Sequence, residues 1–277
     1  MSAAIDDANA EFWNELCGSV LAKSIGLLDH SPASLLKFDD AYFELYPYLL
    51  PFIGLDRWKG RKVLEIGLGF GSVGQRLAEA GADYHGLDIA ENPVRMMNNR
   101  MTLIGKPKLA RVGSAKAIPH ADETFDAVVS IGCLHHTGDL ARCLQEVERV
   151  FKPGGTALVM VYNRYSYREW MRRPWATFRS LFATSKSGLK TAARGEYDAN
   201  HKGESAPETV VTSMAELRRM MGGFESIRIE KQNCNHFLVR GRFGLKRATL
   251  LPTLGRWMGL DLYAEAVKPR SAMKRAA

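Results

Sequence analysis

Four glycines that follow an apolar stretch form the pattern with the clearest chemical meaning. The segment reads Val63-Leu-Glu-Ile-Gly-Leu-Gly-Phe-Gly-Ser-Val-Gly74, and nineteen residues after Gly69 the chain reaches Asp88. A strand that turns sharply into a helix beside a ligand needs residues without a Cβ that tolerate positive φ, and we assign this role to Gly67, Gly69 and Gly71. A carboxylate at the tip of a neighbouring strand accepts both hydroxyls of a ribose. The pattern therefore predicts a nucleoside-binding site.

Two cofactors compete for this site. Counted from Gly69, the glycines form the dinucleotide fingerprint Gly-x-Gly-x-x-Gly with an acidic residue about 20 positions on. Counted from Glu65, they resemble the first motif of class I S-adenosylmethionine-dependent methyltransferases, Glu-x-Gly-x-Gly-x-Gly. The strand 62–66 already ends before Gly67, whereas the dinucleotide pattern needs its first glycine to close the strand. A carboxylate at Glu65 also attracts an ammonium and a sulfonium and repels a pyrophosphate. We favour S-adenosylmethionine and keep a nicotinamide dinucleotide as the alternative.

Two adjacent histidines follow a later apolar stretch. His135 and His136 come shortly after the strand expected over 122–130. Ligands of open α/β sheets bind at the carboxyl ends of the strands, and imidazole has a suitable pKa for a general base near neutrality. Either ring is a candidate catalytic base, with a slight preference for His135. The alternative is that the pair enters a helix and bonds only to the backbone.

No metal site is expected. Cys133 and His135 are two ligands without partners at a known zinc spacing. His201 and His236 lie in irregular segments, where we expect solvent-exposed or structural roles. The cysteines contain no Cys-x-x-Cys pair, which indicates reduced thiols rather than a disulfide frame or a structural zinc. They are Cys17, Cys133, Cys143 and Cys234.

Strands and helices alternate around these residues. A helix is expected over 140–150, and another over 213–221 with Thr212 or Ser213 as its cap. The alternation predicts an α/β fold with a parallel sheet covered by helices on both faces. Residues 7–53 read as helices that close over the cofactor, whereas 163–208 shows no strand pattern. The strands are expected at 62–66, 83–88, 109–112, 122–130, 156–161, 224–230 and 260–267.

The order and spacing of these pieces resemble the type 11 branch of class I methyltransferases, which includes ubiquinone-type and natural-product O-methyltransferases. The resemblance covers roughly residues 60–162 and includes Leu134-His-His-Thr-Gly138 and Phe151-Lys-Pro-Gly-Gly155. It implies a doubly wound, Rossmann-like sheet of seven strands, with 224–230 and 260–267 as the last two and one of them antiparallel. It also implies methyl transfer from S-adenosylmethionine, with S-adenosylhomocysteine as coproduct.

The resemblance further suggests an acceptor class and cofactor residues. The acceptor is expected to be a small molecule, most simply a hydroxyl oxygen of a natural-product or of a lipid or quinone-type substrate. In relatives a histidine of the Leu-His-His position serves as the base. Ser114 departs from the Asp-Ala that relatives carry beside the adenine. The cofactor residues implied are Glu65, Gly67, Gly69, Gly71, Asp88, Ile89, Ser114, Ala115 and Ile131. N- or C-methylation, an oxidoreductase and a non-catalytic accessory protein remain alternatives.

A basic segment over 164–194 is the second informative region. It holds eight Lys and Arg residues against one acid, Glu169, and so carries nearly all of the net charge of +8. Its aromatic residues recur at roughly helical spacing and predict one or two amphipathic helices broken at Pro174. Three interpretations compete, namely a solvated lid, a surface for an anionic or membrane-linked substrate, and a surface for a nucleic acid. The Asp/Asn-Pro-Pro-Tyr motif of nucleobase methyltransferases is absent, which makes nucleic acid unlikely as the substrate.

The bulk properties suit one catalytic unit. With 277 residues and 46% hydrophobic content, the chain can bury one substantial core. We divide it into an N-terminal helical cap (1–55), a cofactor-binding core (56–162), a basic amphipathic insertion (163–210) and a C-terminal completion of the sheet with its tail (211–277). No apolar stretch reaches 18 residues and the start lacks a secretion signal. We therefore expect a cytoplasmic protein. Its oligomeric state is expected to be a monomer or a homodimer.

Overall fold

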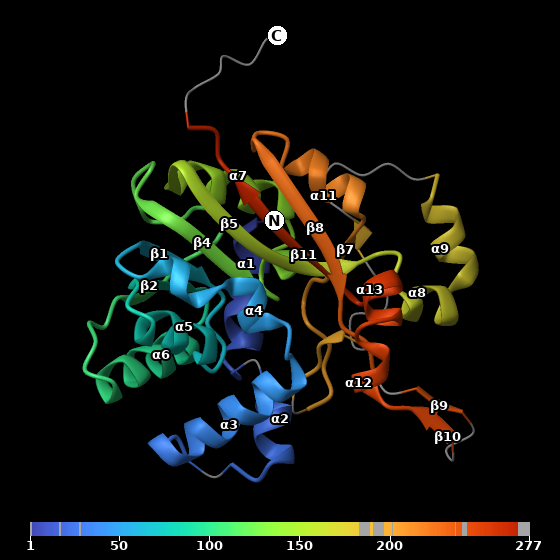
Figure 1. Ribbon diagram of the computed structural model, residues 1–277, viewed down its shortest axis with the longest axis horizontal. Coiled ribbons are helices and arrows are strands. Elements are labelled where there is room, and N and C mark those ends of the chain that lie inside the picture. The colour runs from blue at the N-terminus through green and yellow to red at the C-terminus, as the bar shows by residue number, and fades with distance from the viewer. Residues whose placement is uncertain are drawn as a thin grey trace.

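A twisted sheet forms the centre of the molecule, with seven strands in one continuous order and two short strands beside them (Figure 1). The computed structural model describes residues 2–16, 18–27, 29–182, 189–190, 197–200, 202–235, 237–239 and 243–270. Five strands are parallel, and the sixth position is antiparallel to both of its neighbours. In spatial order the strands are β3 (Ala110–Val112), β2 (Asp83–Asp88), β1 (Lys62–Ile66), β4 (Phe125–Ile131), β5 (Phe151–Asn163), β11 (Asp261–Val267) and β8 (Ser226–Gln232).

This order confirms the predicted Rossmann-like fold. The order in which the chain adds strands to the sheet reverses between the parallel neighbours β1 and β4, the position where open α/β sheets bind their ligands. β1 and β2 have the predicted bounds, while β5 begins earlier than expected because Phe151 already pairs with Phe125 before an irregularity in the ladder.

Two further short strands join the sheet, and the one at 189–190 lies within 163–208, where the sequence shows no strand pattern. β7 (Val210–Thr212) extends the sheet beside the end of β5, and β6 (Leu189–Lys190) pairs with β7. Segments of three and two residues are too short to show an alternating pattern, because that pattern needs at least four residues. β7 nevertheless brings the chain back to the carboxyl edge of the sheet.

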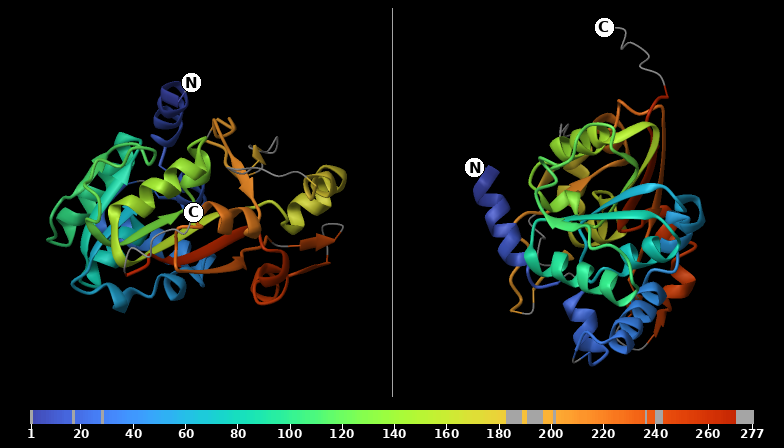
Figure 2. Two further views of the ribbon diagram at one scale, coloured as in Figure 1. Left: turned by 90° about the horizontal axis from the view of Figure 1, so that it is seen from above. Right: turned by 90° about the vertical axis from the view of Figure 1, so that its left-hand side faces the viewer.

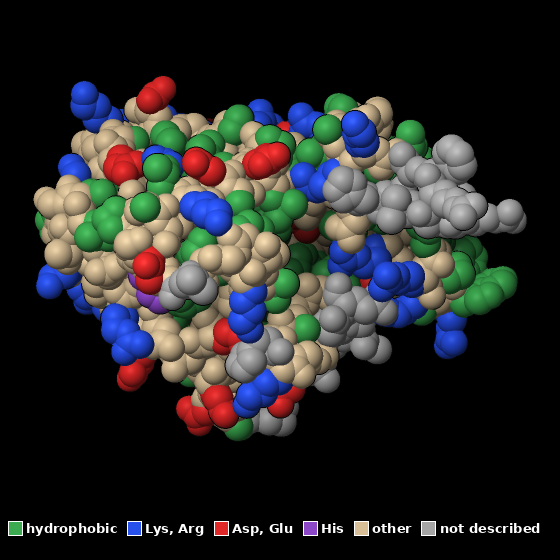
Figure 3. Space-filling model, turned by 90° about the horizontal axis from the view of Figure 1, so that it is seen from below, with side chains coloured by type: hydrophobic (Ala, Val, Ile, Leu, Met, Phe, Trp, Pro, Cys, Tyr) green, Lys and Arg blue, Asp and Glu red, His purple; other side chains and the backbone are tan. Residues whose placement is uncertain are grey.

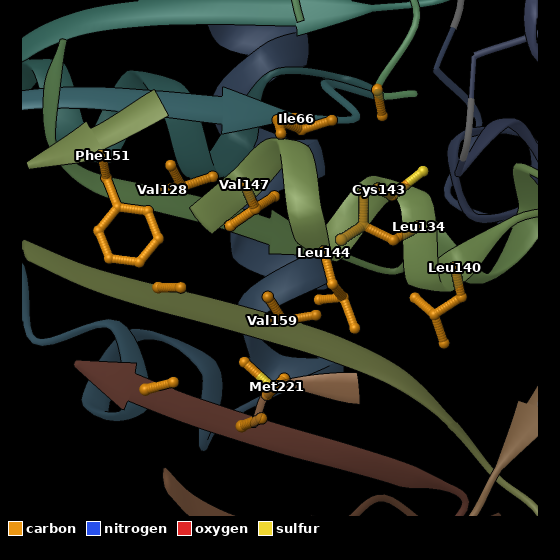
Figure 4. Packing of buried hydrophobic residues seen from close by; sticks show 14 of the residues in the cluster. Ile66, Val128, Leu134, Leu140, Cys143, Leu144, Val147, Phe151, Val159 and Met221 are labelled. Carbon is orange, nitrogen blue, oxygen red and sulfur yellow. The ribbon is translucent and has the colours of Figure 1, made fainter. Parts of the chain in front are cut away.

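Helices cover both faces of the sheet. α7 (Leu140–Val150) and α11 (Met214–Met220) pack on one face, and α5 (Ser72–Glu79) and α6 (Glu91–Leu103) pack on the other. α7 has the bounds that the sequence predicted, since Asp139 caps its first turn and its apolar residues recur every three or four positions. Figure 4 shows Leu140, Cys143, Leu144 and Val147 pointing at the strands.

An N-terminal group of helices, the helical cap, precedes β1. It comprises α1 (Ser2–Trp13), α2 (Ser19–Ser24), α3 (Pro32–Leu45), α4 (Leu49–Ile53) and the single turn η1 (Leu55–Trp58). α2 and α3 pack on Phe70, in the loop at the carboxyl end of β1, whereas η1 leads into the amino end of this strand. A buried ion pair fastens α3 to the Rossmann-like core: Asp39 binds the Arg100 guanidinium at 2.9 Å and accepts the hydroxyl of Ser72 at 2.5 Å. The helical cap is therefore joined to α6 through Arg100 and to the first turn of α5 through Ser72.

A second group of small elements protrudes beyond β8 (Figures 1 and 2). Pro174 separates two helices, as predicted, namely α8 (Tyr167–Arg172) and α9 (Pro174–Ser180). A hairpin and two short helices follow later in the chain, and Leu250 and Leu260 pack with Tyr167 of α8. They are β9 (Phe237–Val239), β10 (Phe243–Leu245), α12 (Arg247–Leu250) and α13 (Leu254–Met258).

Some sequence-based expectations concern residues outside the described ranges. These are the roles of His201 and His236, the thiol of Cys17, and the parts of the basic segment that contain Lys186 and Arg194. Of the helices that the structure describes, none combines the length and the apolar character needed to cross a bilayer.

Candidate functional site

A cavity of about 500 Å³ opens at the carboxyl ends of β1, β2 and β4. This volume lies in the ~300–1,000 Å³ range of small-molecule sites. One wall comes from the glycine loop and β2, with Glu65, Gly67, Gly69, Asp88 and Ile89. The cap helices supply a second wall, with Trp13, Leu16, Phe38, Tyr42 and Tyr46. The third wall contains Ile131, Cys133, His136, Tyr162, Tyr197 and Asp198.

The glycine loop has the backbone that the sequence predicted. Gly67, Gly69 and Gly71 have φ values of 84°, 50° and 77°. A Cβ on Gly67 would lie 2.4 Å from the Cβ of Cys133, and one on Gly71 would lie 2.9 Å from Arg100 Cδ. Gly67 and Gly69 line the cavity, whereas Gly71 begins α5 and packs on α6. The loop therefore needs glycine both for its backbone conformation and for its close packing.

Asp88 is the carboxylate at the end of β2. Its two oxygens accept the backbone N–H groups of Leu68 at 2.7 Å and Ala90 at 3.0 Å, so it fixes the glycine loop to β2. Burial raises the pKa of this carboxyl group to about 6, although these backbone donors act in the opposite direction. A buried carboxylate beside a cavity suits a ligand that brings further donors, as a ribose diol does.

Glu65 lies deeper beneath the loop. Its carboxylate accepts the hydroxyl of Tyr84, and a Cβ on Gly74 would lie 2.5 Å from Glu65 Oε2. Burial raises the pKa of Glu65 to about 8. A cation in the cavity would favour the ionised form, whereas a pyrophosphate would face Glu65 and Asp88 together. These two carboxylates and the glycine loop thus fit S-adenosylmethionine better than a dinucleotide.

His136 is the member of the histidine pair that lines the cavity. It ends the single turn η2 (Leu134–His136) after β4. Its Nδ1 lies 2.8 Å from the backbone carbonyl of Glu208, and a carbonyl only accepts hydrogen bonds, so Nδ1 carries the proton. The other ring nitrogen, Nε2, lies 3.3 Å from Asp198 Oδ2, so the two nitrogens face a carbonyl and a carboxylate.

Residues of the irregular segment complete this wall. The hydroxyl of Tyr162 donates to Asp198 at 2.7 Å, and the rings of Tyr162 and Tyr197 lie 4.6 Å apart. Tyr197 in turn donates to Glu169 at 2.7 Å. Asp198, Tyr197 and Glu208 were not identified from the sequence, because they belong to no motif and come close to His136 only when the chain returns to β7.

His135 does not have the environment that we expected of a base. Its ring is fully buried, does not line the cavity, and lies 4.1 Å from the rings of both His136 and Tyr162. Within the described ranges neither ring nitrogen has a hydrogen-bond partner. Burial, together with His136, holds the pKa of His135 well below its usual value. Of the two rings, only that of His136 borders the cavity.

The remaining predicted cofactor residues divide into two groups. Ile89 and Ile131 line the cavity. Ser114 and Ala115 do not: the Ser114 hydroxyl donates to Asp6 of α1 at 3.0 Å, and Ala115 is buried in the core. An adenine contact by these two residues stays a prediction that the cavity lining does not support.

Metal-binding clusters are absent from the described part of the chain, in which Cys133, Cys143 and Cys234 form no disulfide.

Comparison with known proteins gives a family for the core. Residues 64–159 match a family model described as a methyltransferase domain. A ubiquinone biosynthesis O-methyltransferase of Paracidovorax citrulli is 32% identical over 149 residues, which cover 48% of this chain and 63% of that protein. A fatty-acid O-methyltransferase of Mycolicibacterium smegmatis is 33% identical over 117 residues, which cover 41% of this chain and 42% of the relative. The chain thus spans less than two thirds of the length of these curated relatives.

Solved structures share the fold at low sequence identity. An S-adenosylmethionine-dependent methyltransferase of Methanosarcina mazei has a TM-score of 0.52 and 20% identity, and the match covers 80% of this chain and 98% of the other. The YcgJ protein of Bacillus subtilis has a TM-score of 0.55 and 15% identity, with 82% of this chain and all of the other covered. At such identities the likeness concerns the fold.

Proposed function

We propose that this protein transfers the methyl group of S-adenosylmethionine to a hydroxyl oxygen of a small, largely apolar molecule. The match of residues 64–159 to a methyltransferase domain supports this proposal. The glycine loop, Asp88 and Glu65 hold the methyl donor in this proposal. The wall around His136 receives the acceptor.

One observation carries the choice of oxygen as the acceptor atom. His136 borders the cavity with Nδ1 bonded to the Glu208 carbonyl, so Nε2, beside Asp198, is the ring nitrogen that we assign to take the proton of the acceptor. An acceptor hydroxyl must lose a proton as it attacks a methyl group, and a positioned imidazole contributes about 10²–10⁴-fold to such a step. A carboxylate 3.3 Å away stabilises the imidazolium that results.

The rest of the cavity acts by positioning. Bound S-adenosylmethionine supplies an electrophilic methyl group on a sulfonium, and displacement requires the acceptor oxygen in line with the breaking C–S bond. Tyr162 donates to Asp198 and so holds this carboxylate beside His136 Nε2. Trp13 packs on the His136 ring at 4.8 Å and covers it from the cap side. Alignment of two reactants in this way is worth up to ~7–11 kcal/mol.

Aromatic and aliphatic side chains dominate the acceptor side of the cavity, which suits an apolar acceptor. Trp13, Leu16, Tyr42, Tyr46 and Met160 contribute there. The names of relatives agree with this class, since they include a ubiquinone biosynthesis O-methyltransferase and a fatty-acid O-methyltransferase. A sterol 4-C-methyltransferase of Caenorhabditis elegans, 33% identical over 98 residues, represents carbon methylation among the relatives.

Methyl transfer to defined probes tests the proposal. The protein is incubated with methyl-labelled S-adenosylmethionine and three acceptors: a prenylated catechol, a long-chain alkylphenol and a long-chain fatty acid. The expected result is label in at least one extracted product as a methyl ether or ester, with an equal amount of S-adenosylhomocysteine. Binding of S-adenosylhomocysteine without label on any probe would support an accessory protein instead. Label on carbon would overturn the choice of oxygen.

A further inference from the structure

The most exposed aromatic side chains of the described chain lie on the small elements beyond β8. Trp175 is 79% exposed and Phe182 is 78% exposed, while Phe178 and Leu181 are half-exposed. Trp175 and Phe178 lie three residues apart on α9, and the ring of Phe182, just beyond the end of the helix, contacts that of Phe178 at 5.6 Å. Thr177 on the opposite face is buried. The apolar face of α9 therefore points to solvent, where large apolar patches mark interaction sites.

A second cavity, of about 360 Å³, opens at the base of α9. We call it the basic pocket, because Arg164, Arg219 and Lys231 line it against one carboxylate, Glu216. Arg164 is almost fully buried and pairs with Glu216 at 2.6 Å, while its Nε has no hydrogen-bond partner among the described residues. The pocket keeps a net positive charge around a buried guanidinium, which favours an anion.

The basic pocket and the exposed apolar side chains form one continuous surface. Leu181 lines the pocket directly, and Tyr165 of the pocket donates to the carbonyl of Ser180 at the end of α9. On the other side, the ammonium group of Lys231 donates to the backbone carbonyl of Trp257 at 2.8 Å, and the Trp257 side chain on α13 is 72% exposed. Figure 3 shows hydrophobic and basic side chains side by side at this end of the molecule.

We propose that this surface docks the protein on a membrane that contains anionic phospholipids, with a lipid phosphate in the basic pocket and the side chains of Trp175, Phe178, Phe182 and Trp257 in the interfacial region. Aromatic rings favour the headgroup level of a bilayer, and a basic amphipathic face binds anionic lipid through both apolar contact and charge. No membrane-crossing helix is needed for this mode of binding.

The docking surface lies apart from the reaction site, because the residues that line the basic pocket differ from those that line the catalytic cavity. β5 and its continuation connect the two: Tyr162 contributes to the catalytic cavity, and the next three residues contribute to the basic pocket. Membrane docking thus brings an apolar acceptor to the enzyme without a role in the chemical step, and either claim stands if the other fails.

Co-sedimentation with vesicles tests docking directly. The whole protein is mixed with vesicles of phosphatidylglycerol and phosphatidylcholine, or of phosphatidylcholine alone. We expect binding to the anionic vesicles only, and loss of binding near 1 M salt, where the Debye length falls to ~3 Å. Arg219→Glu should weaken binding by at least about five-fold, since one basic residue near an anionic surface contributes ~1 kcal/mol. A triple variant with Trp175→Ser, Phe178→Ser and Phe182→Ser should abolish it.

Matched controls place the substitutions on another exposed surface. Leu103→Ser and Lys106→Glu, at the end of α6 and just beyond it, should bind vesicles like the parent protein. Every variant should still bind S-adenosylhomocysteine, which shows that it is folded. The proposal is overturned if the parent protein does not sediment with anionic vesicles, or if the controls lose as much binding. Equally tight binding of glycerol phosphate in solution, or self-association abolished by the triple variant without vesicle binding, would also overturn it.

Discussion

The cofactor wall of the catalytic cavity, formed by the glycine loop and β2, differs in construction from the two other walls, which we call together the acceptor wall. The cofactor wall takes Glu65, Gly67, Gly69, Asp88 and Ile89 from one short stretch of chain, in which β1, its loop and β2 are neighbours in both sequence and space. The acceptor wall joins residues that lie far apart in the sequence, and β7 and the cap helices bring them together. It contains Trp13, His136, Tyr162, Asp198 and the Glu208 carbonyl. A short segment fixes the first wall, whereas only the complete fold creates the second.

The largest effect is expected where the cap meets the cofactor wall. Asp39→Ala leaves the fully buried guanidinium of Arg100 without its carboxylate, and removal of one partner of a buried ion pair costs ~3–5 kcal/mol. We expect a large fall in the free energy of unfolding, measured by denaturant titration. Asp40→Ala, at the neighbouring exposed position of α3, is the control and should have little effect. Equal free energies of unfolding for the two variants would mean that the ion pair between Asp39 and Arg100 does not stabilise the fold.

Asp88→Ala should remove the central polar group of the cofactor wall. The substitution eliminates a carboxylate that holds Leu68 N and Ala90 N and faces the cavity. The two ribose hydroxyls would lose their hydrogen bonds to this charged group. At ~1.5–3 kcal/mol for each bond, binding of S-adenosylhomocysteine should be at least about 100-fold weaker in calorimetry. Asp83→Ala, at the other end of β2, should bind normally. Unchanged affinity in Asp88→Ala would remove this residue from the cofactor site.

Gly67→Ala separates backbone strain from packing. The new methyl group would lie 2.4 Å from Cys133 Cβ at a φ of 84°, whereas Gly105→Ala meets nothing within 4 Å at a φ of 66°. Both variants carry the cost of positive φ, ~1–3 kcal/mol, but only Gly67→Ala adds a steric overlap. Thermal unfolding should show the larger destabilisation for Gly67→Ala. If both lose the same stability, the contact between the loop and Cys133 is not required.

Glu65 should make cofactor binding depend on pH. Because burial raises its pKa to about 8, an ammonium that binds the carboxylate must displace a proton near neutrality, and the affinity for S-adenosylhomocysteine should rise about tenfold (~1.4 kcal/mol) from pH 6 to pH 7. Calorimetry in buffers of different ionisation enthalpy measures this proton release. Glu65→Gln should abolish the release, while Glu79→Gln on the exposed side of α5 should retain it.

The same group gives a stability test with a defined sign. The pKa of Glu65 in the folded protein lies above its ordinary value of 4.5, so its stabilising effect is complete below pH 4.5 and is lost as the pH rises through about 8. The neutral side chain of Glu65→Gln escapes this loss. Its melting temperature relative to the parent protein should therefore increase between pH 6 and pH 9, and a constant difference would contradict the raised pKa.

The contrast between the walls also explains what the sequence revealed. The glycine run gave the positive φ values of the loop and the strand bounds of β1 and β2, because glycine spacing and apolar runs act locally. The histidine pair was found, but the sequence does not tell which ring reaches the cavity: both rings are buried, and only His136 lines it. Asp198 lies in a segment without periodicity, and no local pattern connects it with His136.

The central claim is that His136, and not His135, removes the proton of the acceptor. The most direct measurement compares His136→Gln and His135→Gln in single-turnover methyl transfer to the best of the acceptor probes, with S-adenosylhomocysteine affinity measured alongside. We predict that His136→Gln slows transfer by about 10²–10⁴-fold and leaves the affinity within about threefold, whereas His135→Gln retains most of the rate. Unchanged transfer in His136→Gln, or the larger loss in His135→Gln, would contradict the account.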